Sequence, residues 1–259
     1  MHRRGLLDSR NINLLRELTL SQYKLRDQST FFGLLWSFAN PLFMVLVLYT
    51  VFSKRFGEGI SDYGIYLLLG MVQYTYFANA TSTSMRAPVA MRALTKETVF
   101  PKELLVFSSA LTATIDFVIG LCACIVVAYV TGVAPAWSQF WLPVLVLLQF
   151  LLVLWVSLLL ACVHPFTRDI DHIYAVLLRA LLFVTPIFYA KSFLGDGPAR
   201  YLVTFNPLAS LIEQSRRVLL EGTSPGALAL PALVLANAVL VWLSWRLFKR
   251  IEPRLAESL

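Results

Sequence analysis

Long apolar stretches separated by short charged connections take up most of this 259-residue chain. No Asp, Glu, Lys or Arg occurs between Asp27 and Lys54, or between Asp62 and Arg86. A helix needs about 20 apolar residues to cross the roughly 30 Å hydrocarbon core of a bilayer. Stretches of about this length predict six transmembrane spans, at about 31–53, 63–85, 104–130, 138–163, 172–190 and 227–246. Because lipid leaves an open sheet edge without partners, we expect the spans to be helices and the fold to be all-α.

One apolar run is too long for a single crossing. Between Glu103 and Arg168 the only formal charge is Asp116. Gly132 and Pro135 interrupt the run, so it predicts two helices joined by a tight turn.

The N-terminal segment, residues 1–30, has a different pattern. Over residues 11–26 the leucines Leu14, Leu15 and Leu18 fall on one side of a helix, and the charged Arg16 and Glu17 fall elsewhere. This pattern predicts an amphipathic helix on the cytoplasmic membrane surface. A leader helix that only anchors the chain explains the pattern equally well. The transmembrane domain then covers 31–250, and 251–259 is a cytoplasmic tail.

Two connections are longer than a helical hairpin requires. Residues 86–103 carry several charges and predict a short helix that Phe100-Pro101 ends, and a solvated basic loop is the alternative. Residues 191–226 contain an apolar run of 12 residues, Tyr201 to Ile212, which is too short to span. Asn206-Pro207 interrupts it. We therefore expect two half-helices that re-enter the outer leaflet, with a plain surface loop as the alternative.

Composition and charge agree with a membrane protein. The chain is 58% hydrophobic and 14% charged, which excludes an ordinary soluble domain. Its net charge is +7, and with both termini in the cytoplasm 15 Lys and Arg residues lie inside and 6 outside. The charges flank apolar spans and form no continuous patch, so nucleic acid is not an expected partner. The charged N-terminus has no apolar core of a cleavable signal peptide.

Two ionisable residues lie within predicted spans. At 1.5 Å per residue, Asp116 lies about 18 Å past the start of the third span and Arg179 about 16 Å past Arg168, so their depths match. Charges inside a membrane are costly, and we expect a pair that bridges the third and fifth helices. Extension of Arg179 to the inner interface is the alternative.

Aromatic residues make up 13% of the chain. Aromatic side chains offer apolar faces and polar edges to passing sugar rings, so a subset is expected to line a channel, whereas an interfacial belt or packing against lipid is the alternative. The candidate channel residues are Trp36, Tyr49, Tyr74, Tyr76, Phe77, Phe183, Phe188 and Tyr189.

Enzyme motifs are absent from the sequence. It contains no P-loop, no G-x-S-x-G and no H-E-x-x-H. Asp169 and Asp171 form a D-x-D that could hold a divalent cation, but carboxylates at the start of the fifth helix are the favoured interpretation. Cys122, Cys124 and Cys162 lie in spans and predict neither a metal site nor a disulfide. We expect no catalytic residue, metal or cofactor in this chain.

Short motifs in a fixed order point to a family. They are Gly33-Leu34-Leu35-Trp36, Asn40-Pro41-Leu42, Val51-Phe52-Ser53, Tyr66-Leu67-Leu68-Leu69-Gly70, Phe100-Pro101-Lys102-Glu103, Arg168-Asp169-Ile170, Thr185-Pro186-Ile187-Phe188-Tyr189 and Asn206-Pro207. Over nearly its whole length the chain resembles the permease subunits of type-two ABC exporters, which move lipid-linked O-antigen, capsule or teichoic acid.

The resemblance implies a homodimer in the bacterial inner membrane, with a central channel lined by the first, second and fifth spans. Two separate ATPase subunits would bind ATP and magnesium, and the N-terminal helix would be the interface helix. The implied ATPase-coupling residues are Arg86, Arg92, Leu94, Lys96, Glu97, Phe100, Pro101, Lys102 and Glu103. The implied outer gate includes Asn206, Pro207, Glu213, Arg216 and Arg217.

Several functions stay open at this point. An O-antigen-like polysaccharide is the first expected cargo, followed by teichoic acid and then by a drug or small lipid. A membrane-embedded glycosyltransferase that uses Asp169 and Asp171 is an alternative from another class, as is a scaffold that transports nothing.

Overall fold

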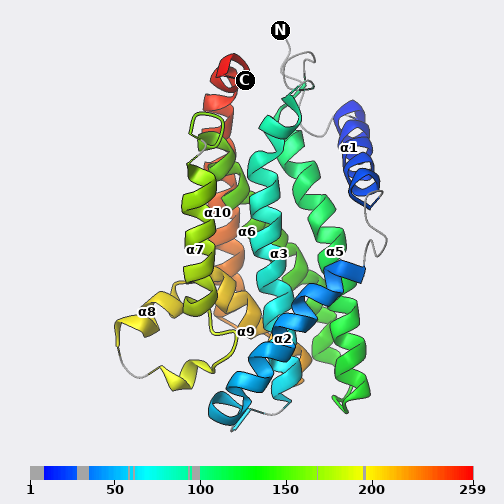
Figure 1. The fold of residues 1–259 in the computed structure, drawn as a ribbon, viewed down its shortest axis with the longest axis vertical. Helices are drawn as coiled ribbons and strands as arrows, with labels where there is room; N and C mark the ends of the chain where they lie inside the picture. The colour runs from blue at the N-terminus through cyan, green and yellow to red at the C-terminus, as the bar shows by residue number, and fades with distance from the viewer. Residues whose placement is uncertain are drawn as a thin grey trace.

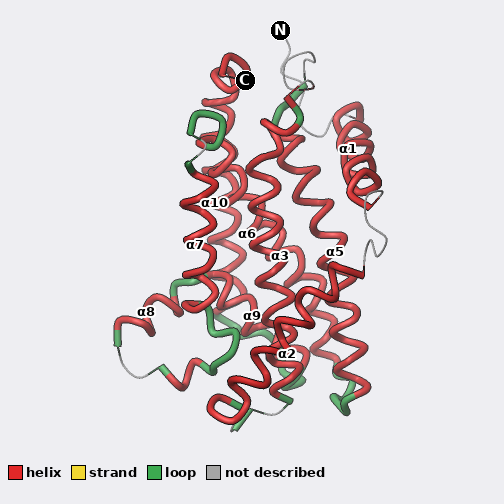
Figure 2. The backbone as a smooth tube through the Cα atoms, in the orientation of Figure 1, coloured by secondary structure: helices red, strands yellow, loops and turns green. Residues whose placement is uncertain are grey.

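The computed structural model describes residues 9–27, 35–57, 59–60, 62–92, 94, 100–167, 169–194 and 197–258. Within these residues the chain forms helices and no strand (Figure 2). The longer helices are α1 (Ser9–Asp27), α2 (Leu35–Phe56), α3 (Tyr63–Ala90), α5 (Glu103–Val130), α6 (Leu142–Val163), α7 (Ile170–Val184), α9 (Pro207–Leu219) and α10 (Ala229–Ser258). Shorter ones are η1 (Trp137–Trp141), η2 (Lys191–Phe193) and α8 (Pro198–Thr204). The expected all-α fold is confirmed for the described chain.

Helix α3 forms the centre of the bundle. It packs against α2, α5, α6, α7 and α9, whereas α10 packs mainly on α6 and α1 packs on α5 (Figure 1). The main hydrophobic core surrounds α3, where Leu67 and Leu69 are fully buried. A second, smaller cluster joins one end of α5, α6 and α10. It consists of Val106, Leu154, Leu158, Ala161, Cys162 and Phe248.

The two ends of the bundle differ in what they carry. The α3–α5 connection, the α6–α7 connection and the end of α10 lie at one end (Figure 1). The α2–α3 turn, the α5–α6 turn, α8 and α9 lie at the other. This arrangement separates the two overlong connections, as the predicted topology requires.

Three helical segments are long and apolar enough to cross a membrane, and they correspond to the predicted third, fourth and sixth spans. They are Glu103–Val130, Trp137–Val163 and Ala229–Arg254. The α5–α6 connection includes Gly132 with a positive φ of 106°, which confirms the predicted tight turn.

Two helix boundaries differ from the sequence expectation. Helix α7 has 15 residues and ends at Val184, not at 190, because the residue before a proline is disfavoured in the α conformation and Pro186 follows Thr185. Helix α10 has 30 residues and continues to Ser258, so the predicted tail at 251–259 is helical as far as that residue.

The predicted amphipathic N-terminal helix is present as α1. Its leucines Leu14, Leu15 and Leu18 are half-buried, and Thr19 is buried. Gln22 Nε2 donates to Ser108 Oγ of α5 at 2.8 Å. Helix α1 is therefore fixed to the bundle through both apolar and polar contacts.

Candidate functional site

The segment that follows α7, residues 185–190, leaves the helical conformation inside the protein. Residues 185–189 are all buried. Buried backbone outside a helix must find hydrogen-bond partners for its N–H and C=O groups elsewhere. Four successive carbonyls, at 186–189, accept hydrogen bonds from side chains of α3 and α9.

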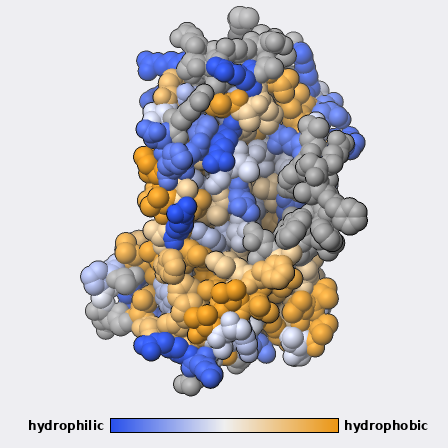
Figure 3. All heavy atoms as spheres, viewed as in Figure 1, coloured by the Kyte–Doolittle hydropathy of each residue, from blue (hydrophilic) through white to orange (hydrophobic). Residues whose placement is uncertain are grey.

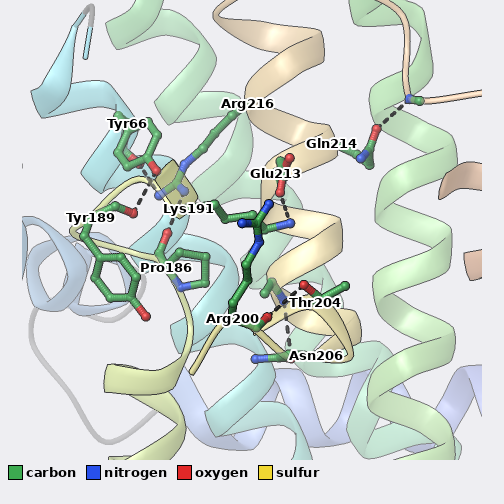
Figure 4. Close-up of polar contacts among 12 residues, drawn as sticks. Tyr66, Pro186, Tyr189, Lys191, Arg200, Thr204, Asn206, Glu213, Gln214 and Arg216 are labelled. Atoms are coloured by element: carbon green, nitrogen blue, oxygen red, sulfur yellow. Dashed lines mark hydrogen bonds and ion pairs between the residues drawn. The ribbon is translucent and has the colours of Figure 1, made fainter. Parts of the chain in front are cut away.

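Arg216 of α9 supplies the donors for two of these carbonyls. Its Nη1 donates to Pro186 O at 2.7 Å, and its Nη2 donates to Ile187 O at 2.8 Å and to Tyr66 O at 3.0 Å (Figure 4). The guanidinium carbon lies 3.3 Å from the centre of the Tyr66 ring, which adds a cation–π contact. Arg216 is only 5% exposed. One buried cation thus holds α3, α9 and the 185–190 segment together.

Tyrosines of α3 bind the other two carbonyls. Tyr63 Oη donates to Phe188 O at 2.7 Å, and Tyr66 Oη donates to Tyr189 O at 3.1 Å. The hydroxyl of Tyr189 in turn donates to carbonyls in the last turn of α7. Tyr63 and Tyr66 therefore fix the backbone of residues 188 and 189 by hydrogen bonds. The Tyr189 side chain ties the same segment to the end of α7.

Helix α9 begins at the predicted Asn206-Pro207 break, with the short helix α8 before it. The expected re-entry of these two helices into the outer leaflet stays a prediction. Asn206 Oδ1 accepts the backbone N–H groups of Leu208 and Ala209 at 3.0 and 3.3 Å, an N-cap. Asn206 Nδ2 donates to Thr185 Oγ1 at 3.0 Å, which ties the start of α9 to the 185–190 segment.

The other predicted gate residues lie nearer the surface. Glu213 forms an ion pair with Lys191 of η2, and both side chains are about two-fifths exposed (Figure 4). Arg217 is half-buried. Of the predicted set, Asn206, Pro207 and Arg216 come together around the 185–190 segment, and the gate role itself stays a prediction.

Most of the predicted channel aromatics are packed inside the chain. Tyr74, Tyr76, Phe77, Phe188 and Tyr189 are each no more than 8% exposed. For example, the Tyr76 ring stacks on Phe117 with centroids 4.3 Å apart. The chain encloses these five in this conformation, and their role in lining a channel stays a prediction. Aromatic content alone does not reveal which side of a helix faces the core.

Two of the predicted channel aromatics do lie on the surface. Tyr49 is 47% and Phe183 is 63% exposed. The side chain of Trp36 lies outside the described residues. Among the predicted channel aromatics whose side chains the structure describes, these two are therefore the ones that lie on the surface.

A polar stripe on α3 was missed by the sequence reasoning. The stripe consists of Thr75, Asn79, Ser82, Thr83 and Arg86, which are exposed or half-exposed on a helix that is otherwise largely buried. Their spacing of three and four residues places them within about one third of the helix circumference. Figure 3 has pale and blue side chains over this part of α3, between α7 and α1, above an apolar band. The helical periodicity of these polar residues was the signal that could have found them.

The polar stripe ends at a charged cluster between α3, α6 and α7. Arg86 Nε lies 2.8 Å from Asp171 Oδ1, and His164 Nε2 lies 3.2 Å from Asp171 Oδ2. Partial burial raises the pKa of the Asp171 carboxyl, but the hydrogen bonds from Arg86 and His164 outweigh it and lower that pKa. Asp171 of the D-x-D motif thus serves as the partner of Arg86 and His164, while Asp169 is exposed.

The predicted ATPase-coupling residues divide into exposed and buried ones. Arg92 and Leu94 are exposed, as is Arg86. Phe100 and Pro101 are half-buried. Lys96 and Glu97 lie outside the described residues, so their part of the prediction is untested.

Lys102 and Glu103, the last two predicted coupling residues, are buried. Glu103 is fully enclosed and lies 2.6 Å from Lys249 Nζ of α10. Burial lowers the pKa of the Lys102 ammonium group, and the nearby Glu252 carboxylate opposes this effect. These two residues therefore face the bundle, away from any surface open to an ATPase.

The predicted ion pair between Asp116 and Arg179 is not formed within the chain. Asp116 of α5 is half-buried and Arg179 of α7 is exposed. Helices α5 and α7 lie on opposite sides of α3 (Figure 1). Matching depths place two residues at the same level of a bundle but leave their direction around it undetermined, so depth alone does not bring the two side chains together.

Comparisons with known proteins agree with the apolar helical bundle. Residues 13–220 match the family described as ABC-2 type transporter. An O-antigen export system permease protein, RfbA, of Myxococcus xanthus is 30% identical over 247 residues, which is 95% of each chain. Two proteins of the same name from Klebsiella pneumoniae are 26% and 27% identical over 248 residues, again 95% of each chain. The family match covers most of the sequence, and the chain belongs to the ABC-2 type transporter family.

Proposed function

We propose that this chain is the membrane subunit of an ATP-driven exporter that carries a lipid-linked, O-antigen-like polysaccharide across the bacterial inner membrane. The chain is a multi-pass membrane protein of the ABC-2 family, in which a permease works with an ATPase subunit. Its full-length relatives are named as O-antigen export permeases, which supports the polysaccharide as cargo.

The polar stripe of α3 is the observation that carries the proposal. From Thr75 to Arg86 it extends for about 17 Å along the helix at 1.5 Å per residue. The Thr83 hydroxyl donates to carbonyls of its own helix, at Asn79 and Ala80. A row of hydroxyl, amide and guanidinium groups with further hydrogen-bonding capacity is nevertheless costly to place in hydrocarbon. Such a face suits a water-filled path, and a polyhydroxylated glycan can exchange hydrogen bonds with it as it moves.

The proposal includes the arrangement in the membrane. Six spans are formed by α2, α3, α5, α6, α7 with the 185–190 segment, and α10, with both termini in the cytoplasm. Two copies face each other across the path, so that the stripes of both line it. Two ATPase subunits bind ATP and magnesium and contact the exposed part of the 86–103 connection, and this chain needs no cofactor of its own.

Bulky substitutions on the polar stripe test this function in cells. Disrupting the gene should cause the lipid-linked glycan to accumulate on the cytoplasmic side, and the wild-type chain should restore it to the surface. Thr83→Phe should fail to restore it, because the added ring fills the path. Leu235→Phe on the outer face of α10, where Leu235 is 67% exposed, is the matched control and should restore export.

Two results would contradict the proposal. A normal amount of glycan on the cell surface after gene disruption would contradict the proposed export function. Normal export by Thr83→Phe, at a wild-type protein level, would show that the glycan does not pass along the stripe.

A further inference from the structure

A charged cluster connects the end of the 86–103 connection to α10. The carboxylate of Glu103 lies 2.6 Å from Lys249 Nζ and accepts a hydrogen bond from Trp245 Nε1 at 3.5 Å. Lys249 Nζ also donates to Glu252 at 3.0 Å. Glu252 in turn accepts the backbone N–H of Lys102 at 2.8 Å. The connection is therefore held to α10 through both a side chain and the main chain.

The surroundings make this cluster stronger than an ordinary surface ion pair. Glu103 is fully buried, whereas the Lys249 side chain is about one third exposed. The pair lies beside the smaller hydrophobic cluster, to which Phe248 of α10 and Val106 of α5 belong. A buried carboxylate is costly unless it is paired, so separating α5 from α10 here would leave Glu103 without compensation.

Helix α10 also makes contact near its other end. Just before α10 begins, the backbone N–H of Gly226 donates to Gln214 Oε1 of α9 at 2.7 Å (Figure 4). Two residues later on α9, Arg216 holds the 185–190 segment. From Ala229 to Lys249, α10 extends for about 30 Å between the two contacts at 1.5 Å per residue.

From these contacts we infer that Glu103, Lys249 and Glu252 form a clamp that makes α10 move with the ATPase-contacting connection. Glu103 and Lys249 are then positioning residues for the coupling of ATP hydrolysis to export, and α10 carries the movement toward α9. This inference rests on the proposed function, because it assumes that an ATPase acts on the 86–103 connection.

Removal of the Lys249 charge tests the clamp in the complete complex of this chain with its ATPase, in membrane vesicles. Lys249→Met should leave ATPase co-purification and ATP hydrolysis in place. Export per ATP hydrolysed should fall by about 5- to 150-fold, the range typical when coupling between two sites is lost. Arg246→Met is the matched control, because Arg246 is exposed and its guanidinium carbon lies 4.1 Å from the centre of the Trp242 ring. It should keep normal coupling.

A cross-link provides a second test that does not depend on the stability of Lys249→Met. Glu103→Cys and Lys249→Cys are combined in a chain in which the three native cysteines are replaced by Ser. Before cross-linking the protein should hydrolyse ATP with weak export, and a bifunctional thiol reagent long enough to replace the two native side chains should restore export per ATP. A merely structural defect would not recover on cross-linking.

The outcomes separate the clamp from the proposed function. Normal coupling in Lys249→Met would overturn the clamp, as would failure of the two cysteines to cross-link or loss of export on cross-linking. Failure of both the wild-type chain and Arg246→Met to bind the ATPase or to export glycan would instead overturn the proposed function.

Discussion

Replacement of Arg216 by Met should destabilise the protein more than any other single charge removal on α9. Arg216 is 5% exposed and donates to carbonyls of the 185–190 segment and of α3. Met fills a similar volume but donates no hydrogen bond. The change therefore removes the donors while it keeps most of the packing.

The expected cost follows from the carbonyls left without a donor. A buried polar group that loses its partner costs about 1–3 kcal/mol, so Pro186 O and Ile187 O together correspond to about 2–6 kcal/mol. The carbonyl of Tyr66 lies inside α3 and can keep its helical hydrogen bond, so it adds little. Met also removes the cost of burying the Arg216 guanidinium charge, and this gain offsets part of the loss. We expect a net destabilisation of about 3 kcal/mol.

Thermal unfolding of the purified protein in detergent measures this cost. Cys124 and Cys162 are buried, so a thiol-reactive dye labels them on unfolding, and the exposed Cys122 is replaced by Ser. A loss of about 3 kcal/mol should lower the midpoint by roughly 6–12 °C in a chain of this size. Arg217→Met, the half-buried neighbour on the same helix, is the control and should shift the midpoint much less.

The reasoning is refuted if Arg216→Met leaves the midpoint unchanged, or if Arg217→Met lowers it equally. Arg216→Lys should give an intermediate value, because an ammonium group keeps the charge but lacks the planar fork that reaches several carbonyls.

Three further predictions concern other contacts in the bundle. Gly→Ala in a helix interior usually stabilises a protein by about 0.5–1 kcal/mol. Gly70→Ala should instead lower the unfolding midpoint, because the new Cβ would lie 2.7 Å from Arg216 Nη2. Gly120→Ala, whose new Cβ would lie 3.4 Å from its nearest neighbour, should not lower the midpoint. Asn206→Ala should cost about 1 kcal/mol through loss of the N-cap, and an unchanged unfolding midpoint would contradict the cap. The pKa of the Asp171 carboxyl is lower in the folded protein than its unfolded value of about 4. The stabilisation by Asp171 is therefore present above about pH 4 and is lost as the pH falls through the lower folded pKa. In Asp171→Asn, the folded protein should lose less stability below about pH 4 than the wild type does.

The sequence predicted well the features that depend on local chemistry. Uncharged length predicted the apolar helices α5, α6 and α10, and Gly132 and Asn206-Pro207 predicted the turn after α5 and the start of α9. Each of these signals acts on the residues beside it, through hydrophobicity, a positive φ, a cap or a missing N–H group.

Features that depend on direction around a helix could not be predicted. The depth of Asp116 matched that of Arg179, yet α3 lies between their helices. Tyr76 was a plausible channel residue by type, but it packs on Phe117. The burial of Arg216 is set by the carbonyls of a segment some 30 residues earlier in the chain, and no local pattern reports that contact.

Reconstitution tests the central claim most directly. The purified chain and its partner ATPase subunit are placed in lipid vesicles that contain the lipid-linked glycan. An impermeant glycan-binding protein reports the glycan exposed on the outside. With the ATPase enclosed inside, addition of ATP to the interior should move glycan to the outer surface, and a non-hydrolysable ATP analogue should not. Failure of the ATPase to bind this chain, or movement of glycan at the same rate without ATP, would contradict the account.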